Sequence, residues 1–270
     1  MNNDVVTTAI DPRGVATVTL NRPEKHNAFD DTIIAELREA FDSLAQRDDV
    51  RVVILASTGK SFSAGADLAW MKRMAKYDFG HNLNDAELLA GMLKALHDLP
   101  QPTIARVQGA AFGGAVGLVS CCDMAVGSER ASFCLSEVKI GLIPATISPF
   151  VIKAIGERAA RRYFTTAERF SAAEAHRIGL LSEVVKEQQL DDAVEALVCA
   201  LLANGPTAVR AAKQLIVDVA GRNIEPKLIE DTCVRIAHIR VSEEGQEGLS
   251  AFLNKRSPQW NISQDDANVQ

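Results

Sequence analysis

The chain has 270 residues, of which 47% are hydrophobic and 24% charged, and its formal net charge is −6. This composition suits a globular chain that buries a full core, as one large domain or a domain with an appendage. The acidic balance excludes a surface whose main task is to grip nucleic acid, because that needs a dominant basic face. No run of about 18 apolar residues and no signal-like N-terminus occur. We therefore expect neither a membrane span nor secretion.

The cysteines and histidines follow no pattern of a metal or disulfide site. The five cysteines are an odd number without C-x-x-C spacing, and most lie in apolar runs. They are interpreted as reduced thiols of a cytoplasmic protein. The histidines are scattered without H-x-x-x-H or H-x-x-E spacing, so no metal site is expected.

Strands and helices alternate through the first half of the chain. The hydrophobic pattern predicts a strand at residues 15–20, a helix at 30–44 with Asp30 or Asp31 as N-cap, and a buried strand at 51–56. After a Gly/Ser-rich loop it predicts a helix at 84–99, a strand at 103–108, a helix at 114–121 and strands at 124–127 and 132–135. Alternation of this kind is typical of an α/β fold.

From Pro149 onward, helical periodicity dominates the sequence. It predicts helices near residues 171–177, 190–202, 206–219 and 227–239, which cap a core or pack on a partner subunit. No Pro/Gly/Ser-rich linker marks a domain boundary, and the polar end at 262–270 is expected to fray.

Two small-residue loops are the main candidates for chemistry. They read SAGADL at residues 63–68 and QGAAFGGA at residues 108–115, and each follows a strand and enters a helix. Unpaired N–H groups at such helix starts, converging on one point, would form an oxyanion hole. The alternative is that these are tight turns whose glycines allow close packing. Asp67 and Asp123 are expected to be helix caps or structural acceptors.

Three segments together resemble a known family. RPEKHNAF at 22–29, SFSAGADL at 61–68 and VQGAAFGG at 107–114, ahead of Cys122 and Asp123, resemble the enoyl-CoA hydratase/isomerase (crotonase) family. Order and spacing agree from about Gly14 to Trp260. The resemblance implies an α/β fold, a crotonase-like spiral of ββα units at residues 1–200 with the active site. It also implies a helical region at 201–270 that forms trimers or dimers of trimers.

The resemblance also implies which residues hold the substrate. The backbone N–H groups of Ala66 and Gly114 would form the oxyanion hole for the thioester oxygen. The coenzyme A tail would be lined by Lys25, His26, Ala64 and Leu68. A C-terminal element with Phe252 and Lys255 would contact coenzyme A as well, although these two residues also fit the solvated basic end of a helix. Coenzyme A is thus part of the substrate, and no separate cofactor is expected.

The catalytic carboxylates depart from the pattern of the family's two-glutamate hydratases. The first glutamate position is Gly117, whereas the second is filled by Glu137 in FCLSEV at residues 133–138. Because this stretch is otherwise apolar, burial is expected to favour the neutral form of Glu137 and bring its pKa closer to working pH. A structural ion pair is the alternative role for Glu137.

One glutamate leaves two reactions open. Glu137 could hold and deprotonate a water that adds to Cβ, or it could carry a proton between Cα and Cγ as in the family's isomerases. DLAWM at 67–71 and the stretch 133–150 resemble the bacterial branch that hydrates 3-methylglutaconyl-CoA in leucine breakdown, which favours hydration. The distal carboxylate of 3-methylglutaconyl-CoA would need a cation in the site, for which Lys72, Arg73 and Lys139 are candidates. A coenzyme A thioester-binding protein without chemistry is the third hypothesis.

Overall fold

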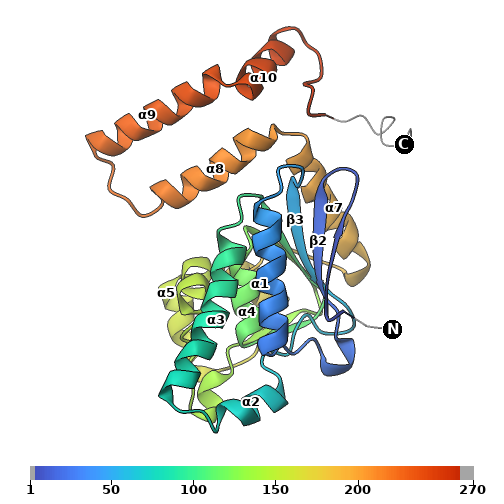
Figure 1. Ribbon diagram of the computed structural model, residues 1–270, viewed down its shortest axis with the longest axis vertical. Helices are drawn as coiled ribbons and strands as arrows, with labels where there is room; N and C mark the ends of the chain where they lie inside the picture. The colour runs from blue at the N-terminus through green and yellow to red at the C-terminus, as the bar shows by residue number, and fades with distance from the viewer. Residues whose placement is uncertain (1–3, 262–270) are drawn as a thin grey trace.

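The computed structural model describes residues 4–261, which form a six-stranded sheet, a three-stranded sheet and the helices around them (Figure 1). The larger sheet has the order β1-β2-β3-β4-β6-β9. Only its first pair is antiparallel. The strands are β1 (Val6–Ile10), β2 (Val15–Leu20), β3 (Val52–Ser57), β4 (Thr103–Val107), β6 (Met124–Ser128) and β9 (Glu183–Val185). Because parallel neighbours need crossover connections, helices cover this sheet, and the predicted α/β class is confirmed.

Helices bury both faces of the larger sheet. On one face the main core contains residues of α1 (Asp31–Ala45), α3 (Phe79–His97), α4 (Gly114–Cys121) and α5 (Ser148–Thr166). On the other face α7 (Leu190–Leu202) packs against the strands, on the opposite side of the sheet from α1 (Figure 1). Parallel strands covered on both sides require continuous apolar sequences, which explains the run in β3.

The smaller sheet leads the chain into the two segments expected to carry chemistry. β5 (Ala110–Phe112) pairs in parallel with β7 (Ser132–Cys134), and β7 pairs antiparallel with β8 (Phe170–Ser171). β5 is followed by α4, and β7 by the one-turn helix η2 (Glu137–Ile140). The remaining short elements are η1 (Pro23–Lys25), α2 (Leu68–Met74), α6 (Ala172–Arg177) and η3 (Glu187–Gln189).

Three C-terminal helices extend beyond the sheets, at the top of Figure 1. They are α8 (Pro206–Val219), α9 (Pro226–Val241) and α10 (Glu243–Leu253). α8 is held to the core by polar contacts: Lys213 Nζ lies 2.6 Å from Asp123 Oδ2, and Arg210 Nη2 donates to Val50 O at 2.9 Å. α10 packs on α9 and α8. α8 buries none of its residues, so its apolar face is left uncovered within one chain.

The structure confirms most predicted elements within one or two residues. No range was predicted, however, for β1, β5, β8, β9, α2, α5 and α10, and α3 was predicted to start too late. β1 was not predicted, because as an edge strand it is mostly exposed and has no clear apolar alternation. α3 begins at Phe79, five residues before the predicted start at 84, because the Asp78 side chain caps it by accepting from His81 N at 2.9 Å.

In the described range 4–261, no single helix has the length and apolar character of a membrane span; one pair, bent by 104°, meets that test only together. The predicted fraying at 262–270 lies outside the described residues.

Candidate active site

Backbone hydrogen bonds fasten the first small-residue loop to β5. Ser63 N donates to Ala110 O at 3.0 Å, and Phe112 N donates to Ser63 O at 3.0 Å. The two loops that the sequence placed about 45 residues apart therefore run side by side. Because one loop leads into α2 and the other into α4, the starts of these two helices lie close together.

On its other side, the same loop is fastened to Phe29. Phe29 N donates to Gly65 O, and Asp67 N donates to Phe29 O, both at 2.9 Å. These bonds use the groups that flank Ala66 but leave its own N–H without an acceptor among the described residues. The Ala66 N–H is therefore available to an oxygen atom of a ligand.

Gly114 offers the second free N–H group. It is the first residue of α4, where helix geometry provides no internal acceptor, and no other described residue accepts from it. Its neighbour Gly113 is anchored by donating to Cys134 O at 2.8 Å. A Cβ on Gly114 would lie 2.5 Å from the Phe29 ring, so close packing there requires glycine.

Glu137 begins η2 beside this turn, because β7 runs parallel to β5. A Cβ built on Gly113 would lie 3.3 Å from Glu137 Oε1, which places the carboxyl group next to the start of α4. Burial raises the pKa of Glu137, and its Oε2 atom is buried without a partner among the described residues. A carboxyl group of this kind suits proton transfer, because its pKa is moved toward neutrality.

The space beside Gly117, the position of the missing glutamate, is filled from the segment that precedes α5. A Cβ at Gly117 would lie 2.4 Å from Cγ2 of Ile147, a side chain that is 3% exposed. The space left by the missing glutamate is thus occupied by an apolar side chain, and the described cavity has no second carboxylate at that point.

Ala66, Gly114 and Glu137 line one cavity of about 220 Å³. The structure therefore brings together the three residues predicted to be catalytic. The rest of the lining is mainly apolar and comes from Phe29, which precedes α1, and from α2, α3 and the segment before α5. The residues of these last three elements are Trp70, Met74, Asn82, Asp85, Ala86, Leu89, Leu142, Ile143, Pro144, Ala145, Thr146 and Ile147. The segment 144–147 forms one wall of the cavity.

The four residues predicted to line coenzyme A gather around the first loop. Ala64 N donates to His26 O at 2.9 Å, and His26 Nδ1 lies 3.2 Å from Ser61 Oγ. Lys25 Nζ lies 3.4 Å from Asp67 Oδ2. Leu68 is 74% exposed at the start of α2. Together they form an open surface beside the Ala66 N–H group.

Phe252 and Lys255 do not line the cavity of their own chain, so their predicted contact with coenzyme A stays a prediction. They lie at and just beyond the end of α10, at the opposite end of the molecule from α2 (Figure 1). Phe252 is 81% exposed there. The physical reason is that the C-terminal helices turn away from the sheets instead of folding back over the loops.

An arginine that the sequence interpretation overlooked holds the loops in place. Arg22 contacts Asp30 and Asp67, each at 2.9 Å, and donates to Ala28 O at 2.7 Å. Asp67 caps α2 by accepting from the N–H groups of Ala69 and Trp70, which confirms its predicted role. The R-P dipeptide was noted as part of a motif, but no local signal indicates a bond over 45 residues.

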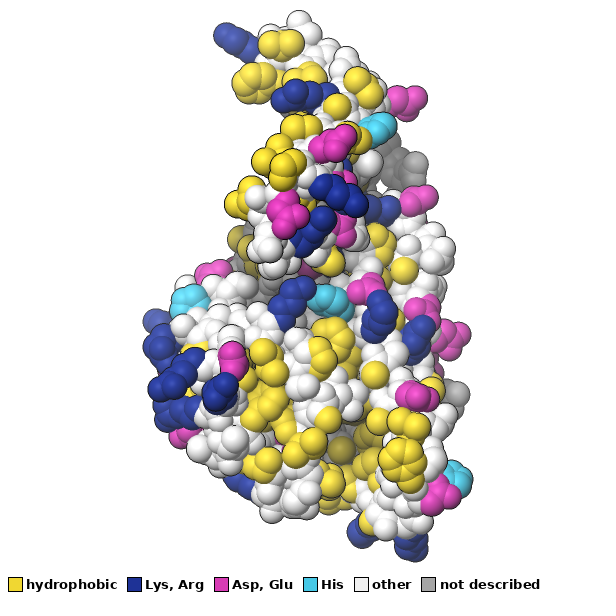
Figure 2. Space-filling model, turned by 90° about the vertical axis from the view of Figure 1, so that its left-hand side faces the viewer, with side chains coloured by type: hydrophobic (Ala, Val, Ile, Leu, Met, Phe, Trp, Pro, Cys, Tyr) yellow, Lys and Arg dark blue, Asp and Glu magenta, His cyan; other side chains and the backbone are white. Residues whose placement is uncertain are grey.

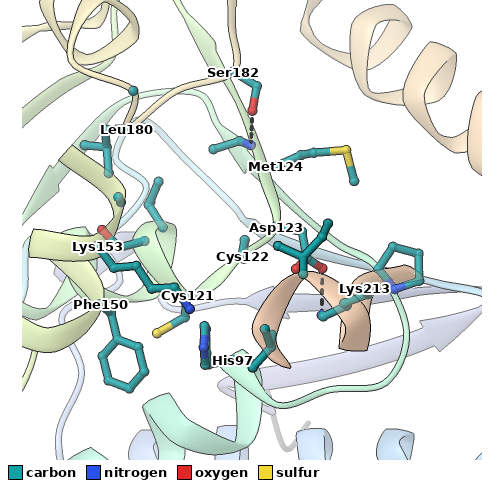
Figure 3. A pocket seen from close by; sticks show the side chains of 18 of the residues that line it. His97, Cys121, Cys122, Asp123, Met124, Phe150, Lys153, Leu180, Ser182 and Lys213 are labelled. Atoms are coloured by element: carbon teal, nitrogen blue, oxygen red, sulfur yellow. Dashed lines mark hydrogen bonds and ion pairs between the residues drawn. The ribbon is translucent and has the colours of Figure 1, made fainter. Parts of the chain in front are cut away.

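A separate cavity of about 480 Å³ lies between α4, α5, β6 and α8 (Figure 3). Among its polar groups, Asp123 accepts from Lys213 Nζ at 2.6 Å, and it also accepts from Thr103 N at 2.7 Å. Burial and the nearby Asp123 carboxylate raise the pKa of Cys122 to about 12, so this thiol is a poor nucleophile at neutral pH. This cavity contains none of the oxyanion donors and is not the acyl site.

The site combines two N–H groups that have no acceptor, a buried carboxyl group and an apolar cavity. Such an arrangement is typical of an enzyme that stabilises an oxyanion while a nearby group transfers a proton. The family model described as enoyl-CoA hydratase/isomerase matches residues 11–263. The chain belongs to this family of enzymes and has the crotonase fold.

Solved structures of similar proteins agree with this assignment. An enoyl-CoA hydratase from Shewanella pealeana is 47% identical, with a TM-score of 0.92 and coverage of 96% of this chain and 97% of the other. An enoyl-CoA hydratase from Mycobacterium smegmatis is 35% identical, with a TM-score of 0.91 and coverage of 96% and 100%. AtuE from Pseudomonas aeruginosa is 31% identical, also with a TM-score of 0.91 and coverage of 96% and 100%.

Proposed function

We propose that the enzyme adds water across the α,β double bond of a 2-enoyl-CoA, with Glu137 as its one catalytic carboxylate. The observation that carries this proposal is the meeting of two free N–H groups, those of Ala66 and Gly114, with Glu137 in one cavity. The donors would bind the thioester oxygen, and the apolar lining would hold the acyl chain.

In the proposed reaction, Glu137 accepts a proton from a water molecule as the water oxygen bonds to Cβ. The π electrons of the double bond move toward the thioester, whose oxygen gains negative charge and is stabilised by the N–H groups of Ala66 and Gly114. Cα then takes a proton from Glu137, and the carboxylate is restored. The raised pKa of Glu137 helps the first half of this cycle, because a more basic carboxylate accepts a proton from water more readily.

The finer substrate assignment rests on the resemblance of residues 67–71 and 133–150 to one bacterial branch. That resemblance implies 3-methylglutaconyl-CoA, or a close branched analogue with a carboxylate, and leucine breakdown as the setting. It stays a prediction, and 3-methylglutaconyl-CoA is one of the substrates with which the proposal should be tested. No cofactor beyond the coenzyme A of the substrate is part of the proposal.

Isomerisation of a 3-enoyl-CoA to a 2-enoyl-CoA is the second candidate reaction. It is favoured by the packing of Ile147 against Gly117, because one carboxylate suffices to carry a proton between Cα and Cγ. No water adds in that reaction, so the two candidates differ in whether conjugation of the thioester is lost or gained.

We further propose that the enzyme is a trimer or a dimer of trimers in the cytoplasm. Exposed apolar side chains on the C-terminal helices support assembly, and Figure 2 shows hydrophobic side chains gathered over the upper part of the molecule. The exposed apolar residues of these helices include Ile216, Ile229, Val234, Val241, Leu249, Phe252 and Leu253. In such an assembly Phe252 and Lys255 would contact the coenzyme A bound to a neighbouring copy. The five free cysteines are in keeping with a reducing compartment.

The test is the absorbance of the conjugated thioester during incubation with wild type and Glu137→Gln. We expect wild type to consume 2-enoyl-CoA substrates, and Glu137→Gln to lower kcat by about 10² to 10⁴, the usual contribution of a general acid–base. Gain of absorbance with a 3-enoyl-CoA alone would establish the isomerase instead. Equal binding of acyl-CoA by both forms without turnover would indicate a non-catalytic binding protein.

A further inference from the structure

The charges in the acyl cavity are all of one sign. Asp85 of α3 and Glu137 line it, whereas no lysine, arginine or histidine belongs to its described lining. The cations considered from the sequence lie elsewhere: Arg73 pairs with Asp31 at 2.5 Å, and neither Lys72 nor Lys139 lines the cavity. A carboxylate at the end of the acyl chain would therefore meet no positive partner from these residues.

Asp85 is fixed in this wall by Trp70. The indole Nε1 of Trp70 donates to Asp85 Oδ2 at 3.0 Å, and the Trp70 side chain is 5% exposed. This bond joins α3 to α2 across the cavity wall. Among the ion pairs of residues 4–261, none includes Asp85, so its charge is not neutralised by a neighbouring cation.

The balance of energies follows from this arrangement. A substrate carboxylate would lose hydration on entering the cavity, and the Asp85 carboxylate would repel it. Recognition of carboxylates normally relies on arginine or lysine, which the described lining lacks. A methyl branch would instead be transferred from water to the apolar lining, which is favourable. The volume of about 220 Å³ also suits a short chain, because drug-sized ligands occupy sites of about 300–1,000 Å³.

We infer that Asp85, held by Trp70, makes this small site selective for 2-enoyl groups that carry no charge. This inference rests on the proposed function, and it departs from the carboxylated substrate that the sequence resemblance implies. Asp85 acts here as a specificity-determining residue, since the reaction itself uses Glu137.

A matched pair of substrates tests the inference. 3-Methylbut-2-enoyl-CoA and 3-methylglutaconyl-CoA differ by one terminal carboxylate, so the ratio of their kcat/KM values isolates the effect of that charge. For the wild-type enzyme we expect the uncharged substrate to be preferred by about tenfold or more. Asp85→Asn keeps an acceptor for Trp70 Nε1 and removes the charge, so it should shift the ratio toward the carboxylated substrate by about tenfold.

Glu87→Gln is the control, because Glu87 is exposed on the same helix, does not line the cavity and loses the same charge. It should change the ratio by less than about twofold, since exposed charges are screened. Preference of the wild type for 3-methylglutaconyl-CoA would overturn the inference and leave the proposed hydratase intact. So would an equal shift in both variants. Absence of hydration with both substrates and with a straight-chain 2-enoyl-CoA would instead refute the proposed function.

Discussion

Glu137 affects both the proposed proton transfer and the stability of the folded protein. Its side chain is partly buried, its Oε2 atom is buried without a partner among the described residues, and burial raises its pKa. The raised pKa means that the folded protein holds this proton more tightly than the unfolded chain does. Ionisation of Glu137 therefore lowers the free energy of unfolding as the pH rises from the usual glutamate pKa through the raised one.

Replacement of Glu137 by glutamine should consequently stabilise the protein at neutral pH but not in acid. We expect the difference in free energy of unfolding between Glu137→Gln and wild type to grow as pH rises through this window, and then to level off. Urea unfolding at about pH 4 and about pH 8 measures it, within the usual range of carboxyl titration. The exposed Glu39→Gln serves as control and should show no such growth. A difference that is independent of pH would contradict the assigned burial effect.

Gly117 occupies the position at which the family's two-glutamate hydratases carry their first glutamate. The glycine is required by the packing of Ile147, whose Cγ2 would lie 2.4 Å from a Cβ at this position. A glutamate could not be restored there without displacing Ile147, because tightly packed interiors do not absorb added atoms freely. The loss of the second carboxylate and the presence of Ile147 are therefore two aspects of one arrangement.

At the scale of elements, the start of α2 depends on a buried ion-pair network. Arg22 and Asp67 are 12% and 9% exposed in their side chains, and they join the segment before α1 to the loop that carries Ala66. Burial opposes ionisation of Asp67, but the backbone N–H groups of Ala69 and Trp70 and the nearby Lys25 nevertheless lower its pKa. The carboxylate therefore holds both the helix cap and the position of the oxyanion donor.

Two substitutions of Asp67 should separate the contribution of its helix cap to stability from that of its negative charge. Asp67→Ala removes both and leaves Arg22 without one of its partners, so we expect the free energy of unfolding to fall by about 3 kcal/mol and kcat to fall as well. Asp67→Asn keeps an acceptor for the cap and should lose less stability. Urea unfolding and steady-state kinetics measure the two effects, and full retention of kcat in Asp67→Ala would contradict a positioning role for this network.

At the scale of the whole molecule, the C-terminal helices differ from the core. α8 buries no residue, α9 buries only Leu228, and α10 buries only Ala251, although all three carry large apolar side chains. Apolar surface of this extent on helices that extend from a core is typical of a surface that another copy covers. The proposed trimer would bury these side chains and bring Phe252 near the site of a neighbour.

Polar substitutions on this surface should therefore dissociate the assembly. For Val241→Asp with Phe252→Asp we expect a shift from a trimer or hexamer toward the monomer, because burial of two unpaired carboxylates is unfavourable. Light scattering coupled to gel filtration gives the mass. Leu88→Asp, at an exposed leucine of α3, is the control and should leave the mass unchanged. A wild-type enzyme that is monomeric at all concentrations would refute the proposed assembly.

The sequence by itself determined the α/β class, most element boundaries, the two small-residue loops and the position of Glu137, because periodicity, turns and motifs are local features. Only the tertiary structure decided which side chains surround the reacting groups. Ile147 against Gly117, Asp85 bonded to Trp70, and Arg22 between Asp30 and Asp67 are contacts between separate elements. The distance of Phe252 from its own cavity is likewise a result of how helices pack. Such contacts leave no periodic trace in a single chain, since any of several residues of similar size or charge could have met there.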